Sequence, residues 1–253
     1  MVVSAQSSVR GAVGPMRRGQ PTTGNRQQGA VSRPPPAAGH PAATRLPSGI
    51  RGWTDGRVLK EVNQVYQLIV IGCSMGGMAA MEAVFAPLPE DFRVPIVVVQ
   101  HRYRTSGEAL PAFLRRHSKL NVVDATDKQW IRPGYVYLAP ADYHLLVDRA
   151  GELSLSVEDA VSYSRPSIDV LFESASDAYL GNLIGVVLTG ANADGARGVK
   201  RIKEHGGFVV VQDPRTAESP AMPQAAIAAT RVDRILPLDR IGPFLVELCR
   251  YNG

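Results

Sequence analysis

A serine, a histidine and two aspartates each follow a buried-looking apolar run in this 253-residue chain. Ser74 lies in the sequence Gly-Cys-Ser-Met-Gly, His101 follows VVVQ, Asp194 follows LIGVVL and a short turn, and Asp213 follows FVVVQ. A serine hydroxyl becomes a useful nucleophile at neutral pH when an imidazole takes its proton and a carboxylate orients that imidazole. These residue types therefore predict a serine hydrolase, in which the serine attacks a carbonyl carbon and forms an acyl-enzyme.

Glycines at positions 72, 76 and 77 surround Ser74. Small residues allow a sharp turn between a strand and a helix, which leaves the hydroxyl at the tip, as in a nucleophile elbow. Backbone N–H groups at such a helix N-terminus can also stabilise an oxyanion. The alternative is a glycine-rich turn that binds a phosphate. The spacing is not Gly-x-Gly-x-x-Gly, and no Gly-Lys-Ser/Thr follows, so the nucleophile is the leading hypothesis.

The general base is expected to be His101, because it alone among the five histidines follows a predicted buried strand. The other four lie in the N-terminal segment, at helix ends or at the start of a hairpin strand: His40, His117, His205 and His144. A structural histidine that binds backbone is the alternative for His101. Periodicity does not choose between Asp194 and Asp213 as the acid, since aspartate at either site can also cap a helix or turn.

Apolar runs without alternation, separated by helical patterns, predict the strands of a doubly wound, mostly parallel sheet. The expected fold class is α/β, a Rossmann-like three-layer sandwich whose ligands bind beyond the carboxyl ends of the strands. Alternating segments at 134–138, 143–148 and 152–157 predict an inserted antiparallel hairpin region. Helices are expected over six ranges: 77–85, 106–117, 165–179, 195–205, 223–230 and 241–251.

Residues 1–60 are predicted to form a disordered basic Pro/Arg-rich tail, and residues 61–253 one domain. The first 54 residues hold seven Arg, seven Pro and no Asp or Glu, so they carry a charge of +7; since the whole chain has a net charge of +5, about −2 is left for residues 55–253. Such a tail is expected to be a solvated linker; contact with nucleic acid or an acidic membrane surface is the alternative. A transit peptide is disfavoured by Pro34–Pro36, which breaks an amphipathic helix.

Cys73 and Cys249 give no disulfide framework, which suits a reducing compartment. No apolar run reaches the roughly 18 residues that would span a bilayer, so a cytoplasmic location without membrane insertion is expected. The pattern requires no cofactor and no metal.

Seven motifs over about residues 66–248 resemble, in this order, the catalytic domain of the CheB family of chemotaxis methylesterases. They are IGCSMGG, VVVQH, YVYLAP followed by His144, RPSIDVLFESA, LTGANADGARG, GGFVVVQDPRTA and AMPQAA. The resemblance implies a triad of Ser74, His101 and Asp194, with Asp213 in a structural or second-shell role. It also implies hydrolysis of glutamyl methyl esters on chemoreceptor helices, with deamidation of receptor glutamines as a related activity.

The chain departs from the family pattern beside the expected triad. Met75 stands where a threonine is usual, Ala191-Asn192 replaces Met-Gly, and Ala141-Asp142 replaces Gly-Gly. The oxyanion is expected to bind backbone N–H groups near Met75 and Ala191. A binding module that kept the fold without useful activity is the alternative function, and a general small-ester hydrolase is a third.

Family members usually carry an N-terminal receiver domain, which needs an acidic pocket. The acid-free first 54 residues lack such a pocket, so a stand-alone esterase domain is expected. Its activity should then need no phosphoryl donor, and regulation by a receiver domain would require a separate receiver protein as partner.

Overall fold

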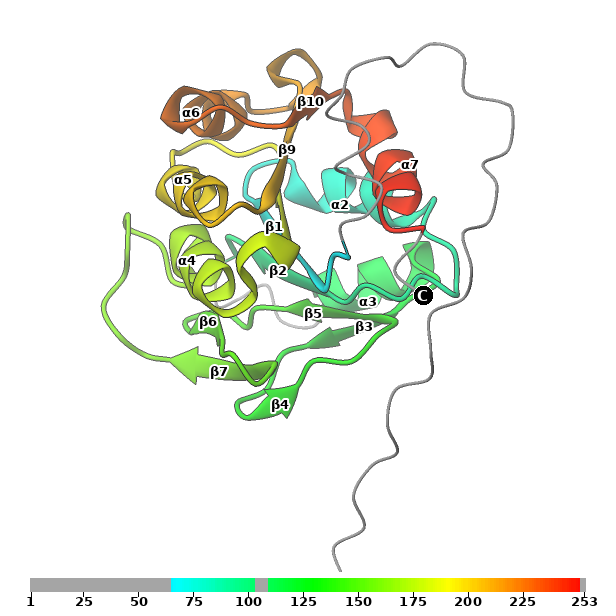
Figure 1. Ribbon diagram of the computed structural model, residues 1–253, viewed down its shortest axis with the longest axis vertical. Helices are drawn as coiled ribbons and strands as arrows, with labels where there is room; N and C mark the ends of the chain where they lie inside the picture. The colour runs from blue at the N-terminus through cyan, green and yellow to red at the C-terminus, as the bar shows by residue number, and fades with distance from the viewer. Residues whose placement is uncertain (1–64, 103–108, 251–253) are drawn as a thin grey trace, which may run out of the picture. The chain divides into compact units, whose positions relative to one another are not determined.

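The computed structural model describes residues 65–102 and 109–250, so the predicted tail of residues 1–60 lies outside it. A seven-stranded sheet runs in the order β10-β9-β8-β1-β2-β5-β3, and every neighbouring pair in it is parallel (Figure 1). The chain builds outward from β1 on one side and then on the other, which makes the end of β1 the switch point. The strands are β1 Leu68–Cys73, β2 Ile96–Gln100, β3 Asn121–Asp124, β5 Tyr135–Leu138, β8 Leu183–Val187, β9 Phe208–Gln212 and β10 Arg234–Leu236.

Helices cover both faces of this sheet, as predicted (Figure 1). One face packs against α2 Gly77–Phe85, α3 Ala109–His117 and α7 Leu238–Leu248, and the other against α4 Ile168–Tyr179, α5 Ala196–Glu204 and α6 Ala221–Ala229. Two short 3-10 helices also occur among the described residues, η2 Leu180–Asn182 and η3 Pro214–Thr216. Three layers with a parallel sheet in the middle confirm the expected fold class.

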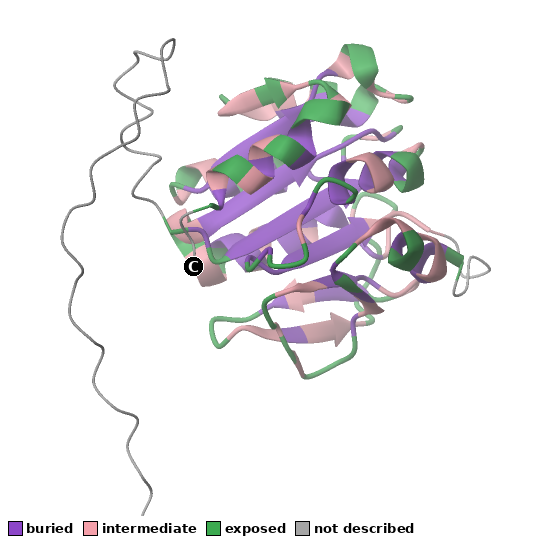
Figure 2. Cartoon of the chain, turned by 90° about the vertical axis from the view of Figure 1, so that its right-hand side faces the viewer, coloured by how far each residue is buried: buried purple, intermediate pink, exposed green. Residues whose placement is uncertain are grey.

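Both faces of the central strands are buried, which explains their continuous apolar sequence. In β1, Ile69 and Ile71 enter the core under α2 and α7, whereas Leu68 and Val70 enter the core under α4. All four are fully buried, and Figure 2 shows the buried strands between partly exposed helices. A strand that is covered on both faces has no face in contact with solvent, so its sequence does not alternate between apolar and polar residues.

The prediction of one antiparallel region over 131–157 was wrong in part. The segment Tyr135–Leu138 is β5, a parallel strand between β2 and β3 of the main sheet. The antiparallel sheet is instead formed by β4 Gln129–Trp130, β7 Glu152–Ser156 and β6 His144–Val147. Tyr137 explains the error. Its sequence context suggested a half-exposed strand, but its ring is buried in the core. Its hydroxyl donates to the carbonyl of Trp130 and accepts the N–H of Arg132, which makes this burial possible.

Helix boundaries differ from the prediction by a few residues near prolines. α6 begins at Ala221, two residues before Pro223, and α7 begins at Leu238 and continues through Pro243. The predicted starts at 223 and 241 had placed both prolines in the first helical turn, where proline is tolerated. The predicted start at 106 and the end at 251 lie outside the described residues. Within the described ranges, none of the helices has the length and apolar character needed to cross a bilayer.

Gly242 provides a test of how closely α7 packs on α2. An ideal Cβ at this position would lie 2.4 Å from the carbonyl oxygen of Val84 and 2.4 Å from Cγ of Pro87. Helix propensity alone favours Ala over Gly by about 1 kcal/mol, whereas overpacking costs roughly 1–3 kcal/mol. We expect Gly242→Ala to lower the free energy of unfolding, as measured by urea denaturation. An unchanged or raised value would contradict this packing.

Candidate active site

The register of the two central strands brings Ser74 and His101 together. Cys73 at the end of β1 is paired with Gln100 at the end of β2, and the backbone N–H of His101 donates to the carbonyl of Cys73 at 3.1 Å. Ser74 and His101 are therefore the next residues on adjacent strands, which lie about 4.8 Å apart. The candidate nucleophile and base thus follow the carboxyl ends of adjacent strands at the switch point, as the strand pattern predicted.

The side chain of Gln100 ties these two strand ends to each other. Its Nε2 donates to the carbonyl oxygens of Ser74 at 2.7 Å and His101 at 3.1 Å, and its Oε1 accepts from Sγ of Cys73 at 3.0 Å. Gly77 leaves room for this amide, since a Cβ there would lie 2.0 Å from Oε1 of Gln100. Gln100 therefore fixes the backbone on both sides of the candidate nucleophile–base pair.

Gln212 makes an equivalent cross-link one strand beyond the site. Its Oε1 accepts the N–H of Thr189 at 2.8 Å, and its Nε2 donates to the carbonyl of Thr216 at 2.9 Å. Neither glutamine was predicted from the sequence to support the site. The available signal was a single polar residue ending each of two apolar strands, IVVVQ and FVVVQ.

Ser74 lies in a sharp turn between β1 and α2, at the position predicted for the elbow. Gly76 has φ +77° at the start of α2, a conformation that a side chain would strain. The N–H of Ser74 donates to the carbonyl of Thr189 at 2.9 Å, and the Thr189 hydroxyl donates to the carbonyl of Met75 at 2.9 Å. These bonds anchor the elbow to the end of β8.

The two backbone N–H groups predicted to bind an oxyanion lie in the segments that follow β1 and β8. Within residues 65–102 and 109–250, neither the N–H of Met75 nor that of Ala191 donates a hydrogen bond. The N–H of Ser74 itself is already bonded to Thr189. Met75 and Ala191, predicted from the sequence as oxyanion donors, thus retain the capacity for that role.

Cys73 is an unsuitable nucleophile although it adjoins Ser74. Its side chain is fully buried, and burial raises the pKa of its thiol far above the usual range. A thiol held neutral has little nucleophilicity. Ser74 is half-buried and remains the accessible candidate. Among the described residues, no group of three His, Cys, Asp or Glu side chains is arranged to hold a metal.

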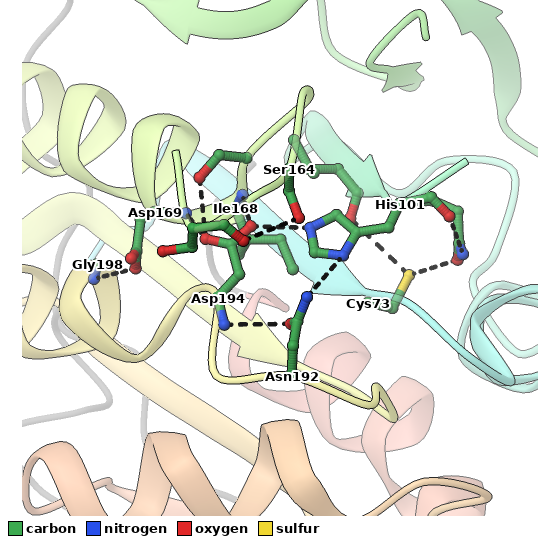
Figure 3. A network of polar contacts seen from close by, with 12 residues as sticks. Cys73, His101, Ser164, Ile168, Asp169, Asn192, Asp194 and Gly198 are labelled. Carbon is green, nitrogen blue, oxygen red and sulfur yellow. Dashed lines mark hydrogen bonds and ion pairs between the residues drawn. The ribbon is translucent and has the colours of Figure 1, made fainter. Parts of the chain in front are cut away.

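His101 and Asp194 form a direct hydrogen bond, with Nε2 2.8 Å from Oδ2 (Figure 3). Nε2 carries the proton, because the carboxylate accepts, so Nδ1 is the nitrogen left to receive a proton. Nδ1 lies 3.4 Å from Nδ2 of Asn192, whose Oδ1 accepts the N–H of Asp194 at 3.2 Å. The hydroxyl of Ser74 makes no hydrogen bond to any described residue.

The carboxylate of Asp194 is buried at the N-terminus of α4. Oδ1 accepts from the hydroxyl of Ser167 at 2.9 Å and the N–H of Asp169 at 3.0 Å, while Oδ2 accepts the N–H of Ile168 at 2.8 Å. Burial by itself raises the pKa of Asp194, but the bonds from His101, Asp169 and Ile168 outweigh burial and hold the pKa below its usual value. Asp194 is therefore ionised and fixed in orientation.

A second buried carboxylate, Asp169, lies beside the first. Its Oδ1 accepts the N–H of Gly198 at 2.8 Å, and its exposed fraction is 3%. Burial raises the pKa of Asp169, and the charge of Asp194 adds to that rise, while the bond from Gly198 opposes it. The two neighbouring carboxyls thus have pKa values displaced in opposite directions.

Asp213 is paired away from His101. Its carboxylate accepts from the guanidinium of Arg215, with Oδ2 2.5 Å from Nη2, and from the N–H of Arg215 at 3.0 Å. These hydrogen bonds lower the pKa of Asp213 to about 2. The carboxylate also caps η3, which is the turn role that sequence reasoning had left open for it. Of the two candidate acids, Asp194 is the one in contact with the imidazole.

Comparison with known proteins matches residues 69–245 to a family model described as CheB methylesterase. A Leptospira interrogans protein named for protein-glutamate methylesterase and protein-glutamine glutaminase activities is 48% identical over 74% of this chain and 97% of its own length. Protein-glutamate methylesterase FrzG of Myxococcus xanthus is 38% identical over 72% of this chain and 54% of its own length. The chain thus spans about half of FrzG.

A solved structure agrees with the sequence matches. The crystal structure of the Thermotoga maritima CheB methylesterase catalytic domain superposes with a TM-score of 0.70 at 34% sequence identity. The alignment covers 72% of this chain and 98% of that one.

Asp169 offers a pH-dependent test of the buried carboxyl pair. A raised folded-state pKa means that ionisation of Asp169 destabilises the fold as the pH rises above the unfolded value of about 3.9. Asp169→Asn keeps an oxygen for Gly198 without the charge. We expect the variant to melt at a higher temperature than the parent at pH 7–8, and the difference to shrink toward pH 4.

Thermal unfolding of both proteins across pH 4–8 measures this difference. Asp194 is present in both proteins, so the difference between them reports the charge of Asp169 together with its repulsion of Asp194. A variant that is less stable at pH 8, or a difference that does not change with pH, would contradict the raised pKa.

Proposed function

The chain belongs to the CheB methylesterase family, and we propose that it hydrolyses glutamyl methyl esters on proteins through a triad of Ser74, His101 and Asp194. The observation that carries the proposal is the His101–Asp194 hydrogen bond, 2.8 Å long, at the strand edge that also presents Ser74. Homologues named protein-glutamate methylesterase support the reaction class. The individual roles of the three residues are our assignment.

Proton transfer follows from which imidazole nitrogen is free. Nε2 of His101 is bonded to Asp194, so Nδ1 takes the proton of the Ser74 hydroxyl as its oxygen attacks the ester carbonyl. The carboxylate of Asp194 then stabilises the imidazolium, since its pKa stays below the usual value. His101 returns the proton to the departing methoxide, and methanol leaves an acyl-enzyme on Ser74.

Water completes the cycle by the same route. Nδ1 of His101 removes a proton from water, the hydroxide attacks the acyl carbonyl, and Ser74 leaves with the proton, which regenerates the enzyme and a glutamate. In both tetrahedral states the oxyanion binds the free N–H groups of Met75 and Ala191. With a glutamine substrate the same steps release ammonia, which corresponds to the glutaminase activity in the relatives' names.

Methylated chemoreceptor helices are the proposed substrates, by analogy with the family. Met75 and Met78 are 57% and 48% exposed next to Ser74, so the elbow offers an apolar contact for a protein surface. A cytoplasmic location, a separate receiver protein as partner and activity without a phosphoryl donor belong to the same proposal. A binding role for nucleic acid has no part in it.

A binding module without useful activity is the second candidate, and Asn192 is the observation that favours it. Its amide faces Nδ1 of His101, where the Ser74 hydroxyl must donate during attack. The contact is long, at 3.4 Å, and weak for a hydrogen bond. A fluorophosphonate probe separates the two functions, because it labels Ser74 only if His101 activates it.

Ser74→Ala tests the proposed function directly. We expect the variant to fold normally and to lose at least about a thousandfold of the rate of methyl-ester hydrolysis, since the acyl-enzyme no longer forms. Mass spectrometry of methylated receptor peptides, before and after incubation, measures the loss of each methyl group. Ser118→Ala is the control, because the hydroxyl of this serine, which follows α3, accepts the N–H of Leu120 and bonds none of the triad residues in the described part of the chain. Methyl loss with Ser74→Ala at the parent rate would overturn the assignment.

A further inference from the structure

His144 is buried at the start of β6, with an exposed fraction of 1%. Its Nε2 lies 3.0 Å from the carbonyl oxygen of Asp159, and its Nδ1 lies 3.2 Å from the backbone nitrogen of Ser167. A carbonyl can only accept and a backbone N–H can only donate. His144 must therefore be neutral, with its proton on Nε2 and the lone pair of Nδ1 directed at Ser167.

Ser167 links this imidazole to the candidate acid. The residue is fully buried at the start of α4, and its hydroxyl donates to Oδ1 of Asp194 at 2.9 Å. A continuous chain of hydrogen bonds thus runs from His144 through Ser167 and Asp194 to His101. Ile168 and Asp169, which also donate to Asp194, are the next two residues of the segment that His144 holds.

The antiparallel sheet holds His144 in place at the start of this series of hydrogen bonds. β6 pairs with β7 along its whole length, and at its other end the N–H of Val147 donates to the hydroxyl of Ser174 in α4 at 3.2 Å. β6 is therefore hydrogen-bonded to α4 near both of its ends. His144 makes the bond at the N-terminus of α4, where the carboxylate of Asp194 also binds.

We propose that His144 is a positioning residue for the esterase reaction: its neutral imidazole holds the N–H of Ser167 and thereby the three donors that orient Asp194. The inference rests on the proposed function. Without an acceptor at Nδ1, the buried N–H of Ser167 has no partner and its segment must shift to find one. A displacement of the acid turns the imidazole of His101 away from Ser74, and errors of about 1 Å in such geometry cost on the order of a hundredfold in rate.

Two isosteric variants separate the two bonds of His144. The Oδ1 of an asparagine replaces Nδ1, so His144→Asn keeps the bond from Ser167 and loses that to Asp159. The Nε2 of a glutamine replaces the ring Nε2, so His144→Gln keeps the bond to Asp159 and loses that from Ser167. We expect His144→Asn to retain kcat within about fivefold, and His144→Gln to lower kcat roughly 10- to 100-fold with KM little changed.

The control is His205→Gln. His205 lies at the end of α5 and bonds Ser176 of α4, and within the described part of the chain it has no hydrogen bond to Ser74, His101 or Asp194. Melting temperatures of all variants show whether the fold survives. A purely structural role would lower stability in both His144 variants without separating their kcat values. Equal kcat for His144→Asn and His144→Gln would overturn the inference.

An NMR measurement keeps this test independent of the esterase assignment. The proton on Nε2 of His101, bonded to Asp194, should resonate far downfield in the parent and in His144→Asn, and should shift or broaden in His144→Gln. If the parent hydrolyses no ester, the proposed function fails while this signal still decides the inference. An unchanged signal in His144→Gln would overturn the positioning role.

Discussion

The burial of one negative charge is the constraint on which the rest of the site depends. Asp194 is 1% exposed, and an unpaired carboxylate in such a place costs roughly several kcal/mol even after the protein relaxes. Four donors offset that cost: the hydroxyl of Ser167, the N–H groups of Ile168 and Asp169, and the imidazole of His101. Three of them come from the first turn of α4, where the helix dipole also favours an anion. The position of α4 is therefore coupled to the orientation of the imidazole.

Parallel pairing supplies the other half of the arrangement. Because β8, β1 and β2 are adjacent and in parallel register, their carboxyl ends deliver the acid-bearing turn, the serine elbow and the histidine to one edge. Backbone pairing between the strands ends at that edge, and side-chain hydrogen bonds continue the connection. Gln100 joins the end of β1 to the end of β2. Gln212 joins β9 to Thr189, and Thr189 joins the end of β8 to the elbow. Side-chain hydrogen bonds therefore join the strand ends beyond the last backbone pair.

Asn192 and Met75 are where this chain differs from the usual family pattern at the site. The amide of Asn192 spans from His101 to the backbone of Asp194, so the turn before the acid is braced by a side chain where the family usually has glycine. Met75 contributes its backbone to the elbow and leaves its side chain 57% exposed. Asn192 therefore adds hydrogen bonds within the site, whereas Met75 presents its side chain to solvent.

The sequence by itself determined the layered α/β fold, the elbow around Ser74 and the position of His101. These features depend on local patterns: uninterrupted apolar runs, glycine spacing and the residue that follows a strand. Asp194 and Asp213 were indistinguishable by pattern, because each follows a strand and can cap a turn; only a resemblance favoured Asp194.

Tertiary structure decided which acid meets the imidazole, since that depends on how α4 docks beside β8. It also decided that Tyr135–Leu138 joins the main sheet, and that Gln100 and His144 support the site. Hydrogen bonds between residues 23 to 27 positions apart, such as those from Ser167 to His144 and to Asp194, leave no periodicity in the chain. These hydrogen bonds form only after whole helices and strands have packed together, so a local pattern in the sequence does not predict them.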